Sequence, residues 1–177
     1  MARWLAVTAL AFLVLGTARA QTGENPFRTA KVGDWARYKM TTRAKGLDFD
    51  VEVMQKVTAR DAKFVTLSTT NKLKDKEFPG KEEKIDLSKP YNPAAAKGAK
   101  EKAKVEKIDE GAEKITVAGK SHACKRTKFK VTTTDQKVSQ VTIWVSPALP
   151  LSGMAKLEIK GSNAEILFEL LESGRGQ

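Results

Sequence analysis

Apolar and polar residues alternate with a period of two through most of this chain, and this period restricts the fold more than any other feature. The clearest run lies between residues 47 and 57. Its apolar members are Leu47, Phe49, Val51, Val53 and Val57, and its charged members are Asp48, Asp50, Glu52 and Lys56. Because successive side chains of a strand point to opposite faces, the run predicts a strand with one buried and one solvated face.

Similar runs predict strands at 35–42, 63–73, 121–133, 138–146, 154–160 and 164–172. Shorter strands are expected at 85–87, from about residue 105, and at 114–117, with a break at residues 79–80 and a turn at 109–111. Strand–helix alternation with a period of about 30 residues is missing, which argues against a parallel sheet. We therefore predict a mostly β fold of nine or ten short strands. They would form an antiparallel meander curled into a half-barrel, barrel or sandwich, with at most one or two short helices.

Two segments depart from the alternation. Residues 21–30 are polar and contain Asn25 followed by Pro26, so we expect an extended arm there. Residues 90–104 are rich in Ala and Lys, and Asn92 with Pro93 could begin a helix. Since no apolar stripe runs along this segment, a short exposed helix and a loop both remain open.

The first twenty residues have the layout of a cleavable signal peptide. Arg3 precedes an apolar run of eleven residues, and Ala18 and Ala20 form a small-x-small cleavage site. A membrane span needs roughly 20 apolar residues, so the run is interpreted as a signal rather than an anchor. Cleavage after Ala20 would leave one β domain, residues 21–177, in the periplasm or outside the cell. It would have no cysteine at its start to carry a lipid and no stable membrane anchor.

The charge of the chain favours acidic partners. Its formal net charge is +11, which becomes +9 when Arg3 and Arg19 leave with the signal. Such a charge suits an acidic polymer or an acidic protein. The lysines are spread over nearly every predicted strand, and aromatic residues are few. Nucleic-acid-binding proteins more often gather basic residues in one patch together with aromatic residues that stack on the bases. We therefore expect no nucleic-acid partner.

No group of residues predicts catalysis or metal binding. His122 is the single histidine and Cys124 the single cysteine, and a zinc site needs three or four ligands. Asp48, Asp50 and Glu52 could supply a catalytic carboxylate pair, but their spacing is also that of a solvated strand face. We expect a buried Cys124, no disulfide, no cofactor, no metal and no enzymatic activity.

Large aromatic residues are the remaining candidates for a binding site. Trp35, Tyr38 and Trp144 lie on predicted strands, and aromatic side chains on a curved sheet can line an apolar pocket. The same residues can equally be core or rim anchors. We mark the three as candidate ligand-binding residues.

Three stretches resemble exported bacterial β proteins, most of which are uncharacterised. They are residues 143–158, residues 32–35, and residues 115–120 together with Cys124. The layout of an export signal followed by a curved meander resembles the lipoprotein-carrier (LolA/LolB-like) group. That resemblance implies a half-barrel that holds acyl chains beneath covering helices, although this sequence shows no amphipathic covering helix. The expected function is a non-enzymatic binder or carrier of a lipid or other apolar or amphiphilic ligand. The alternative is an envelope structural or interaction protein whose basic surface binds an acidic polymer or protein.

Overall fold

The computed structural model describes residues 25–45, 47–89, 104–133 and 135–176. The predicted signal peptide with its Ala18 and Ala20 cleavage site lies outside the described residues, and so does all of the Ala/Lys-rich segment except Lys104. The sheet, the contacts and the surfaces presented below involve only residues within these described ranges.

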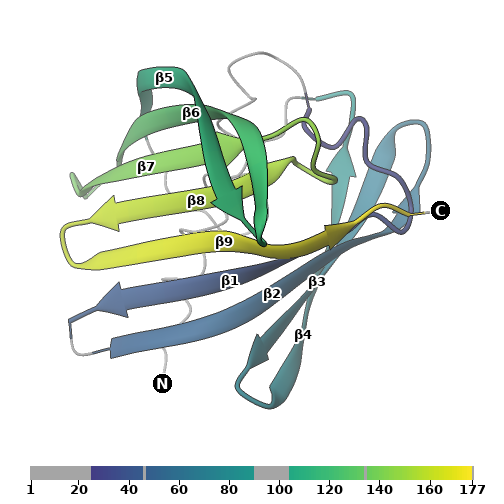
Figure 1. Cartoon of the computed structure of the whole chain (residues 1–177), viewed down its shortest axis with the longest axis horizontal. Helices are drawn as coiled ribbons and strands as arrows, with labels where there is room; N and C mark the ends of the chain where they lie inside the picture. The colour runs from purple at the N-terminus through teal and green to yellow at the C-terminus, as the bar shows by residue number, and fades with distance from the viewer. Residues whose placement is uncertain (1–24, 46, 90–103, 134, 177) are drawn as a thin grey trace.

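Nine antiparallel strands form one open sheet, and the described residues contain no helix (Figure 1). The strands are β1 (Trp35–Ala44), β2 (Leu47–Arg60), β3 (Phe64–Leu73), β4 (Lys76–Asp86), β5 (Lys104–Val117), β6 (Lys120–Thr132), β7 (Val138–Val145), β8 (Met154–Gly161) and β9 (Ala164–Gly174). The predicted antiparallel β fold is therefore confirmed. The strands have 8 to 14 residues; β2, β4 and β5 are longer than expected, whereas β3 and β7 are each one residue shorter.

Two meanders make up the sheet, and the pairing of β1 with β9 joins them. The sheet order is β4-β3-β2-β1-β9-β8-β7-β6-β5, so β4 and β5 are its edges. The sheet curls strongly: β5 contacts β9, which is four places away in that order, and the β5–β6 hairpin crosses the β7–β8 region toward β9 (Figure 1). Curvature of this kind lets an open sheet cover its own apolar side chains.

One side of the sheet, called the inner face here, carries the core. Tyr38 lies opposite Val53 on β2 and Leu170 on β9, and Leu157 lies opposite Ile143 and Phe168. The most fully buried side chains include Tyr38, Val57, Val65, Phe129, Ile143, Leu157 and Ile159. Burying one large apolar side chain contributes roughly 1.5–3 kcal/mol, which makes this face the main source of stability.

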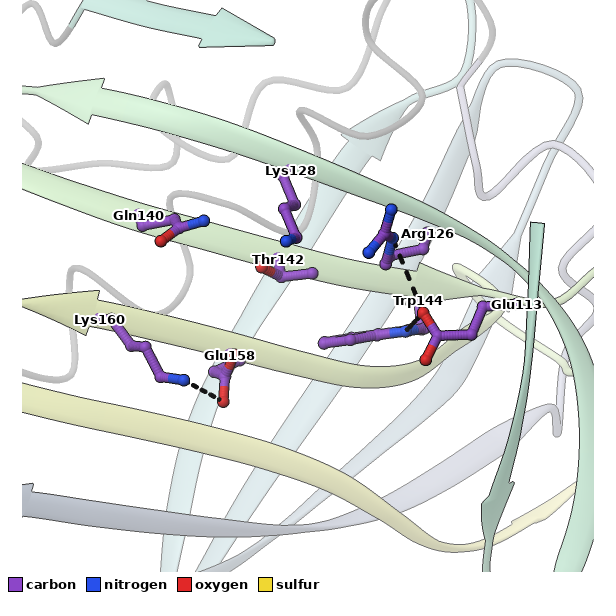
Figure 2. A pocket seen from close by; sticks show the side chains of 8 residues that line it. All are labelled: Glu113, Arg126, Lys128, Gln140, Thr142, Trp144, Glu158 and Lys160. Atoms are coloured by element: carbon purple, nitrogen blue, oxygen red, sulfur yellow. Dashed lines mark hydrogen bonds and ion pairs between the residues drawn. The ribbon is translucent and has the colours of Figure 1, made fainter. Parts of the chain in front are cut away.

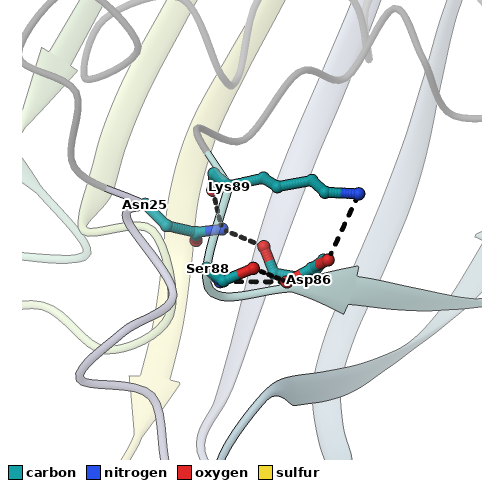
Figure 3. A network of polar contacts seen from close by, with 4 residues as sticks. All are labelled: Asn25, Asp86, Ser88 and Lys89. Carbon is teal, nitrogen blue, oxygen red and sulfur yellow. Dashed lines mark hydrogen bonds and ion pairs between the residues drawn. The ribbon is translucent and has the colours of Figure 1, made fainter.

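The segment before β1 is not the extended arm that its polar composition suggested. Residues 26–29 form turns, and Phe27 and Ala30 pack into the core. The Asn25 side-chain amide donates to the carbonyl oxygens of Asp86 and Lys89, at 3.0 Å each (Figure 3). These hydrogen bonds hold the polar segment against the end of β4. The prediction was wrong because polar residues were taken to indicate solvent exposure, whereas here a polar side chain makes the contact with the fold.

The predicted break at residues 79–80 is also wrong, because β4 continues through it from Lys76 to Asp86. Pro79 is tolerated because β4 is an edge strand and the residue lies beside a bulge, two positions to which proline within a sheet is largely confined. A bulge places Gly80 against Thr69, and a Cβ atom at position 80 would lie 2.0 Å from the Thr69 carbonyl oxygen. The Pro-Gly pair therefore bends the strand without ending it.

The turn predicted at 109–111 is also wrong, and here too the turn-forming residues lie beside a bulge in an edge strand. β5 runs unbroken from Lys104 to Val117 and absorbs one extra residue in a bulge between Lys107 and Asp109. Gly111 then lies opposite Arg126 on β6. The turn-forming residues thus mark a bulge in an edge strand.

Candidate functional site

The side of the sheet opposite the core, called the outer face, is covered largely by cross-strand ion pairs. Lys39 contacts Asp50 at 2.8 Å, and Arg37 contacts Glu172 at 2.9 Å and Glu52 at 3.6 Å. Hydrogen bonds from Lys39 and Thr41 hold the pKa of Asp50 below its usual value. Asp50 and Glu52 therefore lie on the solvated strand face that their spacing allowed, paired with Lys39 and Arg37.

Trp144 lies on the outer face of β7, and only 8% of it is exposed. Its indole Nε1 donates to Oε2 of Glu113 at 3.0 Å, which links β7 to β5 across β6. The Lys156 ammonium group lies 5.4 Å from the indole ring centroid, and Arg126 Nε is 3.7 Å from the same Glu113 oxygen. These contacts fix the indole at one end of a hollow in the outer face.

That hollow has a volume of about 250 Å³ (Figure 2). Its lining comes from four neighbouring strands, and the residues are Glu113, Arg126, Lys128, Gln140, Thr142, Trp144, Glu158 and Lys160. Lys128, Thr142 and Glu158 form one row across β6, β7 and β8. We name this hollow and its eight lining residues the outer pocket. Sequence reasoning found Trp144 but missed the polar residues around it, whose only signal was their shared parity on adjacent strands.

The other two predicted aromatic residues lie elsewhere. Tyr38 is on the inner face, where its hydroxyl donates to the Met154 carbonyl oxygen at 3.3 Å and burial raises the pKa of the phenol. Trp35 is half-buried on the outer face against Gly174. The outer pocket includes neither residue, so the three candidates are not brought together in it.

His122 and Cys124 share a face of β6, as their spacing predicted. Cys124 is a free, buried cysteine, as expected. Burial, with a smaller contribution from the Glu113 carboxylate, raises the pKa of its thiol. The buried Nε2 atom of His122 has no hydrogen-bond partner among the described residues. The described part of the chain contains no cluster of three or more His, Cys, Asp or Glu side chains placed to hold a metal.

A second candidate site lies on the inner face, where β2, β3 and β4 extend past the packed core. Leu47, Leu73 and Phe78 are 48%, 39% and 47% exposed, while Phe49 and Val51 are half-buried and pack against the core. The strand register places all five on the same side of three adjacent strands. We name these five residues the open apolar face. The alternation identified the β2 residues as core, but Phe78 was missed because the Pro-Gly pair beside it indicated a break.

The fold is similar to one already solved. The crystal structure of a "putative lipoprotein" from Parabacteroides distasonis covers 86% of this chain and 99% of that chain, with a TM-score of 0.55 and 14% sequence identity. The likeness is one of fold. It agrees with the predicted antiparallel β architecture.

The other comparisons add no further identity. A DUF1329 family protein from Desulfovibrio piger covers 94% of this chain and 92% of that chain, but its TM-score of 0.29 at 8% identity is too low to indicate a shared fold. No protein-family model matches the sequence, and no curated protein matches it. Within the described residues, no helix is long and apolar enough to cross a membrane.

Proposed function

We propose that this protein is an exported, non-enzymatic binder or carrier of an apolar or amphiphilic ligand, which lies along the open apolar face. The observation that carries the proposal is the exposure of Leu47, Leu73 and Phe78 on the side of the sheet that elsewhere forms the core. Large apolar side chains that stay exposed on one face of a sheet are typical of an interaction site, because their contact with water is unfavourable.

The packed part of the inner face supports a ligand that lies beside the core. Met40, Val53 and Phe168 are each at most 6% exposed, so this part of the sheet is filled by its own side chains. Phe49 and Val51 connect the filled part with the open part. An acyl chain on the open apolar face would extend the existing core by covering these five residues, and its polar end would stay in solvent.

A fluorescence titration with dansyl-labelled undecanoic acid tests the proposal. We expect saturable binding to the purified mature protein, with blue-shifted emission. The double variant Leu47→Ser/Phe78→Ser should bind at least tenfold more weakly, because both exposed apolar contacts are lost.

The matched control is the double variant Val32→Ser/Val138→Ser, since both valines are 48% exposed and neither belongs to the open apolar face. It should bind the probe as the unmodified protein does. Equal binding by the two double variants would contradict the assignment of the site, and no saturable binding by the unmodified protein would contradict the proposed function.

A further inference from the structure

The outer pocket lies on the opposite side of the sheet from the open apolar face, and its chemistry differs. Its walls carry three cationic side chains, two carboxylates, an amide, a hydroxyl and an indole. We propose that the outer pocket binds a carboxylated sugar ring of the uronic acid type. This inference goes beyond the proposed amphiphile site and does not depend on it.

One cation of the pocket is available for a ligand. Arg126 is paired with Asp109 at 2.6 Å, and Lys160 with Glu158 at 3.0 Å. Lys128 lies between them in the lining, and its ammonium group has no ion-pair partner among the described residues. A ligand carboxylate beside Lys128 would supply that partner.

The two carboxylates restrict the ligand further. Glu113 and Glu158 line the same pocket, so a simple anion would be repelled by both of them. A ligand that also carries hydroxyl groups can donate hydrogen bonds to these carboxylates instead. The requirement for one anionic group and several hydroxyl groups in one small molecule is met by a carboxylated sugar.

The arrangement of the pocket agrees with an occupant the size of a single sugar ring. Gln140, Thr142 and Trp144 follow one another along β7, with the Gln140 amide and the indole at opposite ends (Figure 2). The Thr142 side chain lies between them, in the row that joins Lys128 to Glu158. Both Gln140 and Thr142 can bond to ring hydroxyls. The volume of about 250 Å³ is below the roughly 300–1,000 Å³ of pockets for larger ligands, which suits a single ring.

Nuclear magnetic resonance titration of the ¹⁵N-labelled mature protein with sodium glucuronate tests the inference. A ligand of this size binds with a dissociation constant on the order of 1 mM, which amide shifts can follow. We expect saturable shifts at the amides of Gln140, Thr142 and Trp144. Glucose, which has no carboxylate, should bind at least tenfold more weakly. Inorganic phosphate, which has the charge but no carbon-bound hydroxyls, should leave these amides unchanged.

Variants locate the binding. Lys128→Gln should weaken glucuronate binding at least tenfold, and Gln140→Ala should weaken it several-fold. Lys120→Gln is the matched control, because it makes the same charge change at an exposed residue outside the pocket lining. It should change binding less than twofold. Unaltered spectra at high glucuronate, equal shifts with phosphate, or equal loss in the two lysine variants would each overturn the inference.

Discussion

Trp35 and Tyr38 are three positions apart on β1, so their side chains lie on opposite faces of the sheet. Tyr38 lies among core residues with its hydroxyl bonded to Met154, whereas Trp35 lies against Gly174 on the outer face. Trp144 also faces outward, and the Glu113 carboxylate fixes its position. The parity of each position on its strand therefore decides which face of the sheet each of the three aromatic side chains occupies.

Tyr38 gives the molecule a specific sensitivity to alkaline pH. Burial raises the pKa of the folded phenol, while the unfolded phenol titrates near pH ~10. Since the folded state keeps its proton where the unfolded state loses it, this contribution to stability is complete below about pH 10 and declines as the pH rises further.

The variant Tyr38→Phe should therefore behave differently in two ranges of pH. At neutral pH it should lower the free energy of unfolding by about 1 kcal/mol, because a buried hydrogen bond is lost. Between about pH 9 and about pH 11 it should lose less stability than the unmodified protein. Urea unfolding at several pH values measures both effects, and parallel stability curves for the two proteins would contradict this role of the buried phenol.

Both edge strands of the sheet contain bulges, and each bulge lies where the sequence contains a turn signal. β4 carries Pro79 and Gly80, and β5 carries its extra residue between Lys107 and Asp109. Bulges, prolines and charged side chains discourage the edges of two sheets from pairing. These features therefore discourage a further strand from pairing at either edge of the sheet.

The glycine of the β4 bulge is required by its close approach to β3. Gly80→Ala places a methyl group against the Thr69 carbonyl oxygen, so it should cost about 1–3 kcal/mol or detach the end of β4. Hydrogen exchange of the β3 and β4 amides, together with urea unfolding, measures either result. Gly111→Ala is the control, since its new methyl group would meet only the Arg126 guanidinium at 3.6 Å. Equal effects of the two variants would disprove the role given to Gly80.

The sequence predicted the strands well wherever alternation alone decides the structure. β1 was expected at 35–42 and spans Trp35–Ala44, and β8 was expected at 154–160 and spans Met154–Gly161. It failed at β4 and β5, because a Pro-Gly or Asp-Glu-Gly sequence looks the same in a turn and in an edge-strand bulge. Which strands are edges depends on the pairing of β1 with β9, a contact between the two ends of the domain that local patterns do not contain.

The candidate sites were less predictable than the strands. Trp144 was marked from its residue type, but Lys128, Thr142 and Glu158 are 14 to 30 positions apart in the sequence and become neighbours only through the strand register. The open apolar face depends on where the core ends along β2, since Leu47 and Val57 have the same pattern and opposite exposure. Alternation gives the face of a side chain, whereas its burial depends on what the curled sheet places over it.

At the scale of the whole molecule, the two faces of one sheet offer two different surfaces. The inner face is filled along most of its area and open at the ends of β2, β3 and β4, and the outer face is polar and contains the outer pocket. The resemblance to the lipoprotein-carrier group implied a half-barrel with covering helices, whereas the described residues of this protein include no helix. In the proposed function, the ligand would lie at the side of the core along the open apolar face, with its polar end in solvent.

The proposed function depends on the open apolar face holding an apolar or amphiphilic ligand. Native mass spectrometry can detect such a ligand directly, with the full-length chain exported in a bacterial host, purified without detergent, and then extracted with organic solvent. We expect an added mass that is lost on denaturation and recovered as a lipid or other amphiphile in the extract. The added mass should be reduced in Leu47→Ser/Phe78→Ser and kept in Val32→Ser/Val138→Ser. An added mass that is retained equally by both double variants would contradict the proposal, and so would a bare protein mass that stays unchanged after incubation with fatty acids and phospholipids.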